Sequence, residues 1–503
     1  MTTAQSGAST EERQDIDPRL RRLAVVVLLG AIMTILDTTI INVAVHTLGR
    51  SFDASLSTIQ WVVTGYTLAL SMAIPLTGWS VRRFGARTMW LTALGLFAAG
   101  SLLCGVAWSA PSLIAFRVLQ GLGGGMLLPV GQTMLAQAAG LERMGRVMSI
   151  VSVPAMLAPV LGPLLGGVIV DDLSWRWLFY VNLPFSVIAL VAAVRMLPRD
   201  TERVPGARLD VLGIALLSPG LAALVYGLSE AGNGAGPGSV RVLLGVGGGA
   251  LLIALFAVHA SRKGDSALID LRLLRSRPFV TATSGLFLYS AAVFGLMILL
   301  PLYSQVVRGE SPLEAGWLLA PLGLGAIVTM PLAGRLADRH GSRWLAAGGL
   351  ALALCGALAL TQAGPDTSRT ALMSAIFVIG LGHGVMAPSL MAATYQGLPR
   401  PSIPGATTGA NILVRIGSSI GTAGLAIVLQ LAIRDTVPGT SGNLRETATA
   451  QASSQLNGAF THTFWWATVI AAIAVIPILA VPRRAALTAP TTSVGEQRET
   501  RGA

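Results

Sequence analysis

Charged side chains are scarce in this sequence of 503 residues, because Asp, Glu, Lys and Arg together make up 12% of it. A soluble domain carries about twice that fraction. Hydrophobic residues account for 53% of the chain, and they gather in long runs. This composition excludes an ordinary soluble protein and predicts an all-α protein that crosses a lipid bilayer many times.

Cysteine and lysine are nearly absent as well. Cys104 and Cys355 both fall inside apolar runs, which argues against a disulfide framework. Lys263 is the only lysine, and the phosphate-binding motif G-x-x-x-x-G-K-[ST] does not occur, so ATP-driven transport is not expected. The sequence likewise predicts neither an enzyme nor a cofactor or metal site.

The net charge of +12 does not indicate a nucleic-acid-binding protein, because the basic residues lie in short loops between apolar runs. Fourteen runs are long enough to span a bilayer. They lie near residues 23–48, 58–81, 88–108, 111–138, 147–170, 175–197, 209–229, 240–260, 278–306, 313–337, 344–362, 370–396, 404–433 and 464–481. Polar residues 436–457 are expected to form a flexible loop.

The distribution of basic residues predicts the orientation, because cytoplasmic loops are enriched in Lys and Arg. Of the 35 Lys and Arg residues, 26 lie on the side of the N-terminus and seven on the other side. Arg117 and Arg415 lie within spans. We therefore expect a multi-pass protein of the plasma (inner) membrane with both termini in the cytoplasm.

An internal repeat divides the chain. The pattern of residues 75–87 recurs 256 positions later, and that of residues 121–129 recurs 259 positions later. Gly162 corresponds to Gly421 by the same shift of 259 positions. Parallel halves around a site near the membrane midplane are a transporter architecture. The expected organisation is given by the following residue ranges: a tail (1–22), a six-helix half (23–197), a linker with two additional helices (198–275), a second six-helix half (276–481) and a tail (482–503).

Asp37 is the one charged residue inside the first run. At 1.5 Å per residue it lies about 21 Å from Leu23 and about 16 Å from Leu48. A carboxylate at that depth requires a partner, water or a proton, and such groups are usually functional. The alternative is a polar residue that only fixes helix packing.

Five motifs in order resemble the fourteen-span drug:proton antiporter branch of the major facilitator superfamily. The similarity covers nearly all of residues 22–484. The motifs are residues 36–44 in the first run, 60–66 in the second, 116–121 in the fourth, 162–167 in the fifth and 175–184 after it. The resemblance implies the major facilitator fold, two six-helix halves plus two inserted helices.

The resemblance assigns roles to several residues. Asp37 and Arg117 are implied in proton coupling, although Arg117 alternatively ties backbone carbonyls. Gly162, Pro163, Gly166 and Gly167 correspond to the antiporter motif, in which a helix breaker lies beside small residues that permit close packing. Ordinary helix packing is the alternative role of these glycines.

Further candidates follow from residue type and place. His383 replaces the glycine of the first repeat, and its imidazole titrates near neutrality, so it is a proton-coupling candidate or a packing residue. We assign seven residues to the substrate cavity, although interface anchoring or packing is an alternative for the aromatic ones. They are Thr34, Trp61, Tyr66, Gln120, Tyr289, Asn411 and Arg415.

The loop after the second span resembles the superfamily pattern G-x-L-A-D-R-x-G-x-R, whose acid helps to hold the cytoplasmic side closed. The first copy has Arg82 where the acid is expected, and the second copy retains Asp338. The predicted cytoplasmic gate consists of Arg83, Gly85, Asp338, Arg339 and Gly341, with the second copy as the latch.

These observations predict a proton-coupled antiporter that exports amphipathic organic compounds, such as drugs and antibiotics, from the cytoplasm. Its partners are the small-molecule substrate, protons and the lipid bilayer, and the two-half fold acts as a monomer. The sequence leaves open a dedicated exporter of one metabolite, siderophore or lipid, and a proton-coupled importer. Nothing in it resembles a channel filter.

Overall fold

The computed structural model describes residues 17–139, 143–144, 146–148, 161–162, 164–170, 172–200, 204, 206–232, 234–236, 238–264, 267–436 and 450–482. Regular structure in these ranges is helical, without a strand. Helices satisfy their own backbone hydrogen bonds, as a chain in lipid must. The all-α prediction is thus confirmed.

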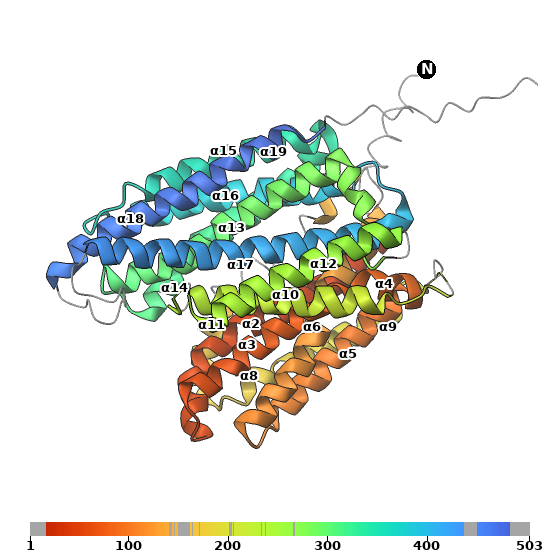
Figure 1. The fold of residues 1–503 in the computed structure, drawn as a ribbon, viewed down its shortest axis with the longest axis horizontal. Helices are drawn as coiled ribbons and strands as arrows, with labels where there is room; N and C mark the ends of the chain where they lie inside the picture. Colours follow the sequence, from red (N-terminus) through yellow and green to blue (C-terminus); the bar gives the residue numbers. More distant parts are fainter. Residues whose placement is uncertain are drawn as a thin grey trace, which may run out of the picture.

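The helices follow the order of the predicted runs (Figure 1). The first half contains α2 (Pro18–Ser51), α3 (Leu56–Ala73), α4 (Leu76–Phe84), α5 (Ala86–Gly105), α6 (Ala110–Ala139), α8 (Trp177–Tyr180) and α9 (Asn182–Met196). The inserted segment contains α10 (Val211–Gly232), α11 (Val240–Val242), η1 (Leu243–Gly247), α12 (Gly248–Lys263) and η3 (Leu271–Arg275). The second half contains α13 (Arg277–Val306), α14 (Pro312–His340), α15 (Ser342–Leu360), α16 (Arg369–Thr394), η4 (Arg400–Ser402), α17 (Ile403–Thr436), α18 (Ala450–Ile473) and α19 (Val475–Leu479).

Twelve helices of the described ranges are long and apolar enough to cross a membrane, and the bent pair α3–α4 makes a thirteenth span. The fifth predicted run, residues 147–170, lies mostly outside the described residues. The second run was expected to be continuous. Instead it bends by 54° between α3 and α4, where Pro75 removes a backbone donor from the helix.

The expected loop at residues 436–457 is wrong at its C-terminal end. The helix α18 begins at Ala450, seven residues before that loop was expected to end. Leu456 is buried among apolar residues of the second half, and the Asn457 side chain donates to the carbonyl of Ala363 at 3.2 Å. Tertiary contacts therefore extend the helix beyond the apolar run.

The repeated glycines occupy equivalent places in the two halves. A Cβ on Gly121 would lie 2.6 Å from the carbonyl oxygen of Tyr66, and one on Gly380 would lie 2.2 Å from that of Leu322. Real Cβ atoms essentially never approach so closely. Both repeats therefore use a glycine where the fourth helix of the half crosses the second, α6 over α3 and α16 over α14.

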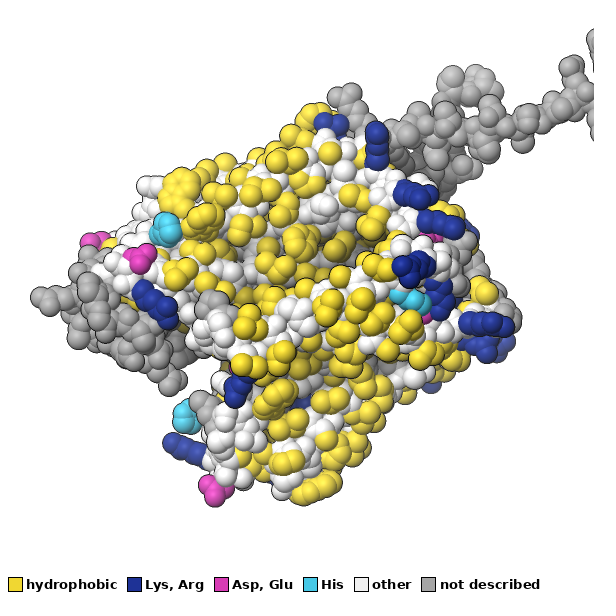
Figure 2. Space-filling view, in the orientation of Figure 1, with side chains coloured by type: hydrophobic (Ala, Val, Ile, Leu, Met, Phe, Trp, Pro, Cys, Tyr) yellow, Lys and Arg dark blue, Asp and Glu magenta, His cyan; other side chains and the backbone are white. Residues whose placement is uncertain are grey.

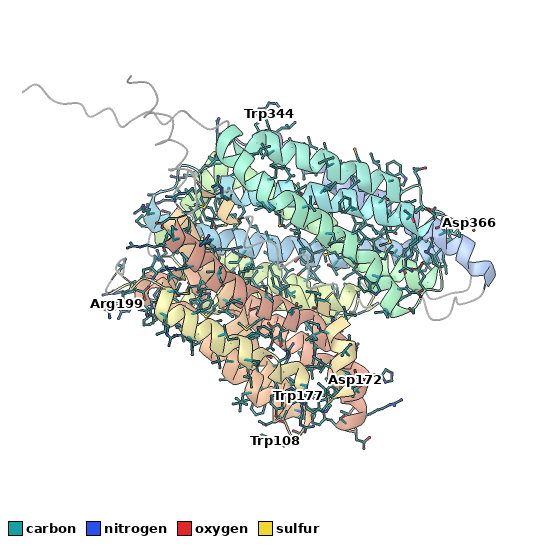
Figure 3. All side chains as sticks on the ribbon, turned by 180° about the vertical axis from the view of Figure 1, so that it is seen from behind. Trp108, Asp172, Trp177, Arg199, Trp344 and Asp366 are labelled. Carbon is teal, nitrogen blue, oxygen red and sulfur yellow. The ribbon has the colours of Figure 1, made fainter. Side chains whose placement is uncertain are left out.

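The two halves meet at one end of the molecule and diverge toward the other. Figure 3 shows Asp172 of the first half and Asp366 of the second half at the diverging end, with Arg199 at the opposite end. The space-filling view shows a notch between the halves at the diverging end and Lys and Arg side chains gathered mainly at the other (Figure 2). The α2 helix begins and α19 ends at this basic end (Figure 1).

The contacts that close the basic end come from both halves. One buried apolar cluster combines Val81 and Met148 of the first half with Leu273, Tyr395 and Ile403. The inserted helix α10 strengthens the junction on one side. Its Ser218, in the first half of the helix, donates to the carbonyl of Met72 on α3 at 2.9 Å. At the other end of α10, away from the basic end, the Gly232 carbonyl accepts from Gln430 on α17 at 3.4 Å.

Candidate functional site

An ion pair is buried inside the first half. Arg117 Nη1 of α6 donates to Asp37 Oδ2 of α2 at 2.5 Å. Both side chains are almost completely excluded from solvent, with 1% of each exposed. A buried pair is stable only if hydrogen bonds satisfy its remaining polar atoms. The surrounding residues supply most of these bonds.

Two amides hold the other oxygen of the carboxylate. Gln120 Nε2 donates to Asp37 Oδ1 at 3.0 Å, and Asn182 Nδ2 of α9 donates to the same atom at 3.1 Å. Both amides also donate to the hydroxyl of Ser101 on α5, at 2.6 and 3.2 Å. The Asp37 cluster, defined as Asp37, Ser101, Arg117, Gln120 and Asn182, thus connects α2, α5, α6 and α9.

Helix α3 also contacts the guanidinium. Arg117 Nε donates to the carbonyl of Val62 at 3.1 Å, and its central carbon lies 4.0 Å from the centre of the Tyr66 ring. The Tyr66 hydroxyl donates in turn to the carbonyl of Thr34 at 3.4 Å. Arg117 therefore pairs with a carboxylate and also ties a backbone carbonyl, as the alternative expected, and its part in proton coupling stays a prediction. Its second terminal nitrogen, Nη2, is buried without a hydrogen-bond partner among the described atoms.

The glycines of the expected antiporter motif pack against α2 beside this cluster. A Cβ on Gly162 would lie 2.0 Å from Thr39 Oγ1, and one on Gly166 would lie 2.9 Å from the carbonyl oxygen of Ile40. Gly167 has no neighbour within 4 Å of an added Cβ, and Pro163 lies outside the described residues. Only Gly162 and Gly166 are therefore required for close approach to the helix that carries Asp37.

A second polar pair lies in the other half. His383 of α16 stacks on Tyr289 of α13 with 5.5 Å between ring centres and 29° between ring planes. His383 Nδ1 and Tyr289 Oη are buried, and neither has a hydrogen-bond partner in the described part of the chain. The pair is separate from the Asp37 cluster, since none of the hydrogen bonds of the cluster involves α13 or α16.

A polar stripe on α17 faces the first half. Thr408 Oγ1 lies 2.9 Å from Thr77 Oγ1 of α4, and Asn411 Nδ2 donates to Gln132 Oε1 of α6 at 2.7 Å. Farther along the helix, Arg415 Nε donates to Ser71 Oγ of α3 at 3.1 Å. Asn411 and Arg415 therefore lie between the halves, and their assignment to the substrate cavity stays a prediction.

Trp61 lies apart from the other cavity candidates. It is 44% exposed and stacks on Tyr226 of the inserted helix α10, with 5.7 Å between the ring centres. Its observed contact is therefore with the inserted segment and not with the Asp37 cluster.

The turn after α4 is built around a glycine and an acid. Gly85 has a φ of 94°, a conformation that L side chains rarely adopt. Asp200 accepts hydrogen bonds from the backbone N–H groups of Arg87 and Thr88 at 2.8 and 3.0 Å, so it caps the positive N-terminal end of α5. Arg83 is exposed.

The second copy of this loop repeats the backbone turn, with a φ of 86° at Gly341. Asp338 and Arg339 belong to the last turn of α14, but their side chains lie outside the described residues. The latch therefore stays a prediction.

An acidic centre fixes the inserted helices at the basic end of the molecule. Asp210, directly before α10, accepts from Lys263 Nζ at 2.7 Å and from the Leu268 N–H at 3.0 Å, and lies 2.8 Å from His259 Nε2. Burial raises the pKa of Asp210, but hydrogen bonds from Lys263, His259 and the backbone outweigh it and lower the pKa to about 2. Lys263, the only lysine of the sequence, therefore helps to anchor the inserted helices.

Sequence reasoning missed Ser101 and Asn182, which complete the hydrogen bonding of Asp37. The available signal was their polarity within apolar runs, where an unpaired amide is costly. In the described ranges no group of three or more His, Cys, Asp or Glu side chains is arranged to hold a metal ion.

Comparison with known proteins gives consistent results. Residues 27–422 match the Major Facilitator Superfamily. The chain is 38% identical over 416 residues to a "Multidrug resistance protein B homolog" of Mycobacterium tuberculosis, which covers 82% of this chain and 77% of that relative. It is 30% identical over 408 residues to the "Putative multidrug resistance protein MdtD" of Escherichia coli, with 81% and 85% covered.

Solved structures share the fold at low sequence identity. The human organic anion transporter MFSD10 superposes with a TM-score of 0.61 and 18% identity, over 91% of this chain and 100% of that one. The proton:xylose symporter XylE superposes with a TM-score of 0.60 and 14% identity, over 92% and 96% of the two chains.

Proposed function

The chain belongs to the major facilitator superfamily, and from this premise we propose that it exports amphipathic organic compounds from the cytoplasm in exchange for protons. Two relatives of at least 30% identity carry names that refer to multidrug resistance, which supports a drug efflux transporter. Proton coupling rests on the Asp37 cluster. That cluster is the single observation that carries the proposal.

Asp37 is suited to couple a proton to a conformational change because its ionised form holds several helices together. It accepts hydrogen bonds from Arg117, Gln120 and Asn182, which belong to α6 and α9. A protonated carboxyl accepts weakly and gives Arg117 no counter-charge. Breaking a buried pair costs about 3–5 kcal/mol, which is enough to shift a two-state equilibrium by roughly a hundredfold to several thousandfold.

The arrangement of the halves is consistent with one state of such a cycle and supports the proposal. The basic end is closed by contacts between the halves, and the opposite end is parted (Figure 2). If the basic end is cytoplasmic, as Lys and Arg enrichment predicts, this is the state open to the outside. Proton uptake by Asp37 from that side would then release the cluster and favour the state open to the cytoplasm.

Everted membrane vesicles test the proposal, because their outer surface is the cytoplasmic face. Ethidium and dansylate (5-dimethylaminonaphthalene-1-sulfonate), an amphipathic cation and anion, serve as probes. An acidic lumen should drive accumulation of at least one of them, and collapse of the gradient with nigericin should abolish it. Probe movement that does not depend on the pH gradient would indicate a channel. Gradient-driven release of the probe from the lumen would indicate an importer.

A further inference from the structure

A second arginine, Arg415, lies within the spans, and unlike Arg117 it forms no ion pair with a carboxylate in the described part of the chain. Arg415 lies twelve residues from the start of α17 at Ile403, and therefore about 18 Å along the helix. That distance places it near the middle of a bilayer about 30 Å thick. Its side chain is partly buried and directed at α3 of the first half, since Nε donates to Ser71 Oγ.

The contacts of Arg415 leave most of its donors unused. A guanidinium has five N–H donors, and the structure assigns one of them, Nε–H, to Ser71. Within the described ranges no carboxylate forms an ion pair with Arg415, and its two terminal nitrogens have no hydrogen-bond partner. Arg117, by contrast, has Asp37 as its counter-charge. A charge near the membrane midplane is costly without such a partner.

The position of Arg415 along the stripe on α17 differs from that of the paired residues before it. Thr408 and Asn411 are each paired with a residue of the first half, so the interface is filled at those levels. Arg415 follows Asn411 by four residues and therefore lies about one turn farther along α17 from its start at Ile403. A guanidinium with free terminal nitrogens matches carboxylate and sulfonate groups, which accept two parallel hydrogen bonds.

We infer that Arg415 binds an anionic group of the transported compound, and that the substrates are therefore amphipathic organic acids. This inference rests on the proposed export function and specifies its substrate class. The Asp37–Arg117 pair contributes no net charge to the spans, so Arg415 supplies the surplus positive charge that favours an anion. Ser71, which is fully buried, holds the guanidinium in place through Nε and leaves the terminal nitrogens for the ligand.

A pair of probes that differ in charge tests the inference by binding alone. Dansylate carries a sulfonate, and dansylamide is its neutral analogue. Fluorescence titration of the full chain in lipid nanodiscs should show dansylate binding roughly ten- to hundredfold more tightly, as expected for hydrogen bonds to a charged group. Arg415→Gln should reduce this ratio to about one, whereas Arg415→Lys should retain a clear preference for dansylate, since a point charge still attracts an anion.

Two controls make the outcome specific. Arg434→Gln removes a positive charge from the last turn of the same helix and should leave the ratio unchanged. Ser71→Ala keeps the charge but removes its support, so it should lower the ratio by less than Arg415→Gln. Equal binding of both probes to the wild type, or an unchanged ratio in Arg415→Gln, would overturn the inference. Gradient-driven ethidium export without dansylate binding would overturn it and leave the proposed function intact.

Discussion

Replacement of Asp37 by asparagine separates the charge of this residue from its shape. In the structure Oδ2 accepts from Arg117, while Oδ1 accepts from both Gln120 and Asn182. An asparagine provides one acceptor oxygen, and its amide nitrogen only donates. The variant therefore loses the hydrogen bond from Arg117 or the hydrogen bonds from both amides. In either case Arg117 is left buried without a counter-charge.

The magnitude follows from these contacts. Removal of one member of a buried ion pair costs about 3–5 kcal/mol, so Asp37→Asn should lower thermal stability while the spans still insert. The double variant Asp37→Asn/Arg117→Gln removes the orphaned charge and should regain most of that stability, because replacement of both partners is often nearly neutral. Neither variant has a side chain at position 37 that can gain or lose a proton.

Two assays separate the effects. Thermal stability of the purified protein, read by fluorescence-detected size-exclusion chromatography, should fall in the single variant and recover in the double one. Probe accumulation driven by a pH gradient in vesicles should be lost in both variants. If accumulation persists in the double variant at the wild-type rate, Asp37 does not carry the coupled proton and the reasoning fails.

Three further predictions concern other parts of the chain. Gly166→Ala should reduce stability by about 1–3 kcal/mol through overpacking and should slow efflux. Gly167→Ala should do neither, because there is open space around Gly167. Equal efflux rates in the two variants would contradict the packing account. Asp210→Asn should destabilise the protein by roughly 2 kcal/mol at neutral pH. Because the pKa of Asp210 is lowered to about 2 in the folded protein, this difference in thermal stability should shrink as the pH falls from about 4; a constant difference would count against it. In a background without native cysteines, Asp338→Asn should increase cysteine labelling from the cytoplasmic side more than Arg82→Ala, and the reverse order would exclude Asp338 as the latch.

Much of the fold was predictable because long apolar runs have few stable forms in a membrane. The bend between α3 and α4 was not predicted, although Pro75 was visible in the sequence, because prolines occur inside spans with and without a break. Pro129 lies within the unbroken helix α6. The start of α18 depends on contacts with Ala363 that no local pattern encodes.

The candidate site was predictable where a charge lay inside an apolar run. Asp37 and Arg117 are distinctive for this reason, and the structure places them in contact. Ser101 and Asn182 are polar residues of a kind that occurs in many spans for packing alone, so no local pattern connects them with Asp37. The stacking of Trp61 on Tyr226 depends on where the inserted helices pack, which periodicity does not determine.

Substrate-driven proton movement tests the exchange of compound for proton most directly. Proteoliposomes that hold the pH indicator pyranine receive an inward gradient of ethidium or dansylate, whichever the vesicle assay shows to be transported, with no pH gradient imposed. Both probes keep their charge over the pH range used and carry no proton themselves. Antiport predicts that the lumen becomes alkaline as the probe enters, and that Asp37→Asn abolishes this change. Entry of the probe without a change in luminal pH, or with acidification, would contradict the account.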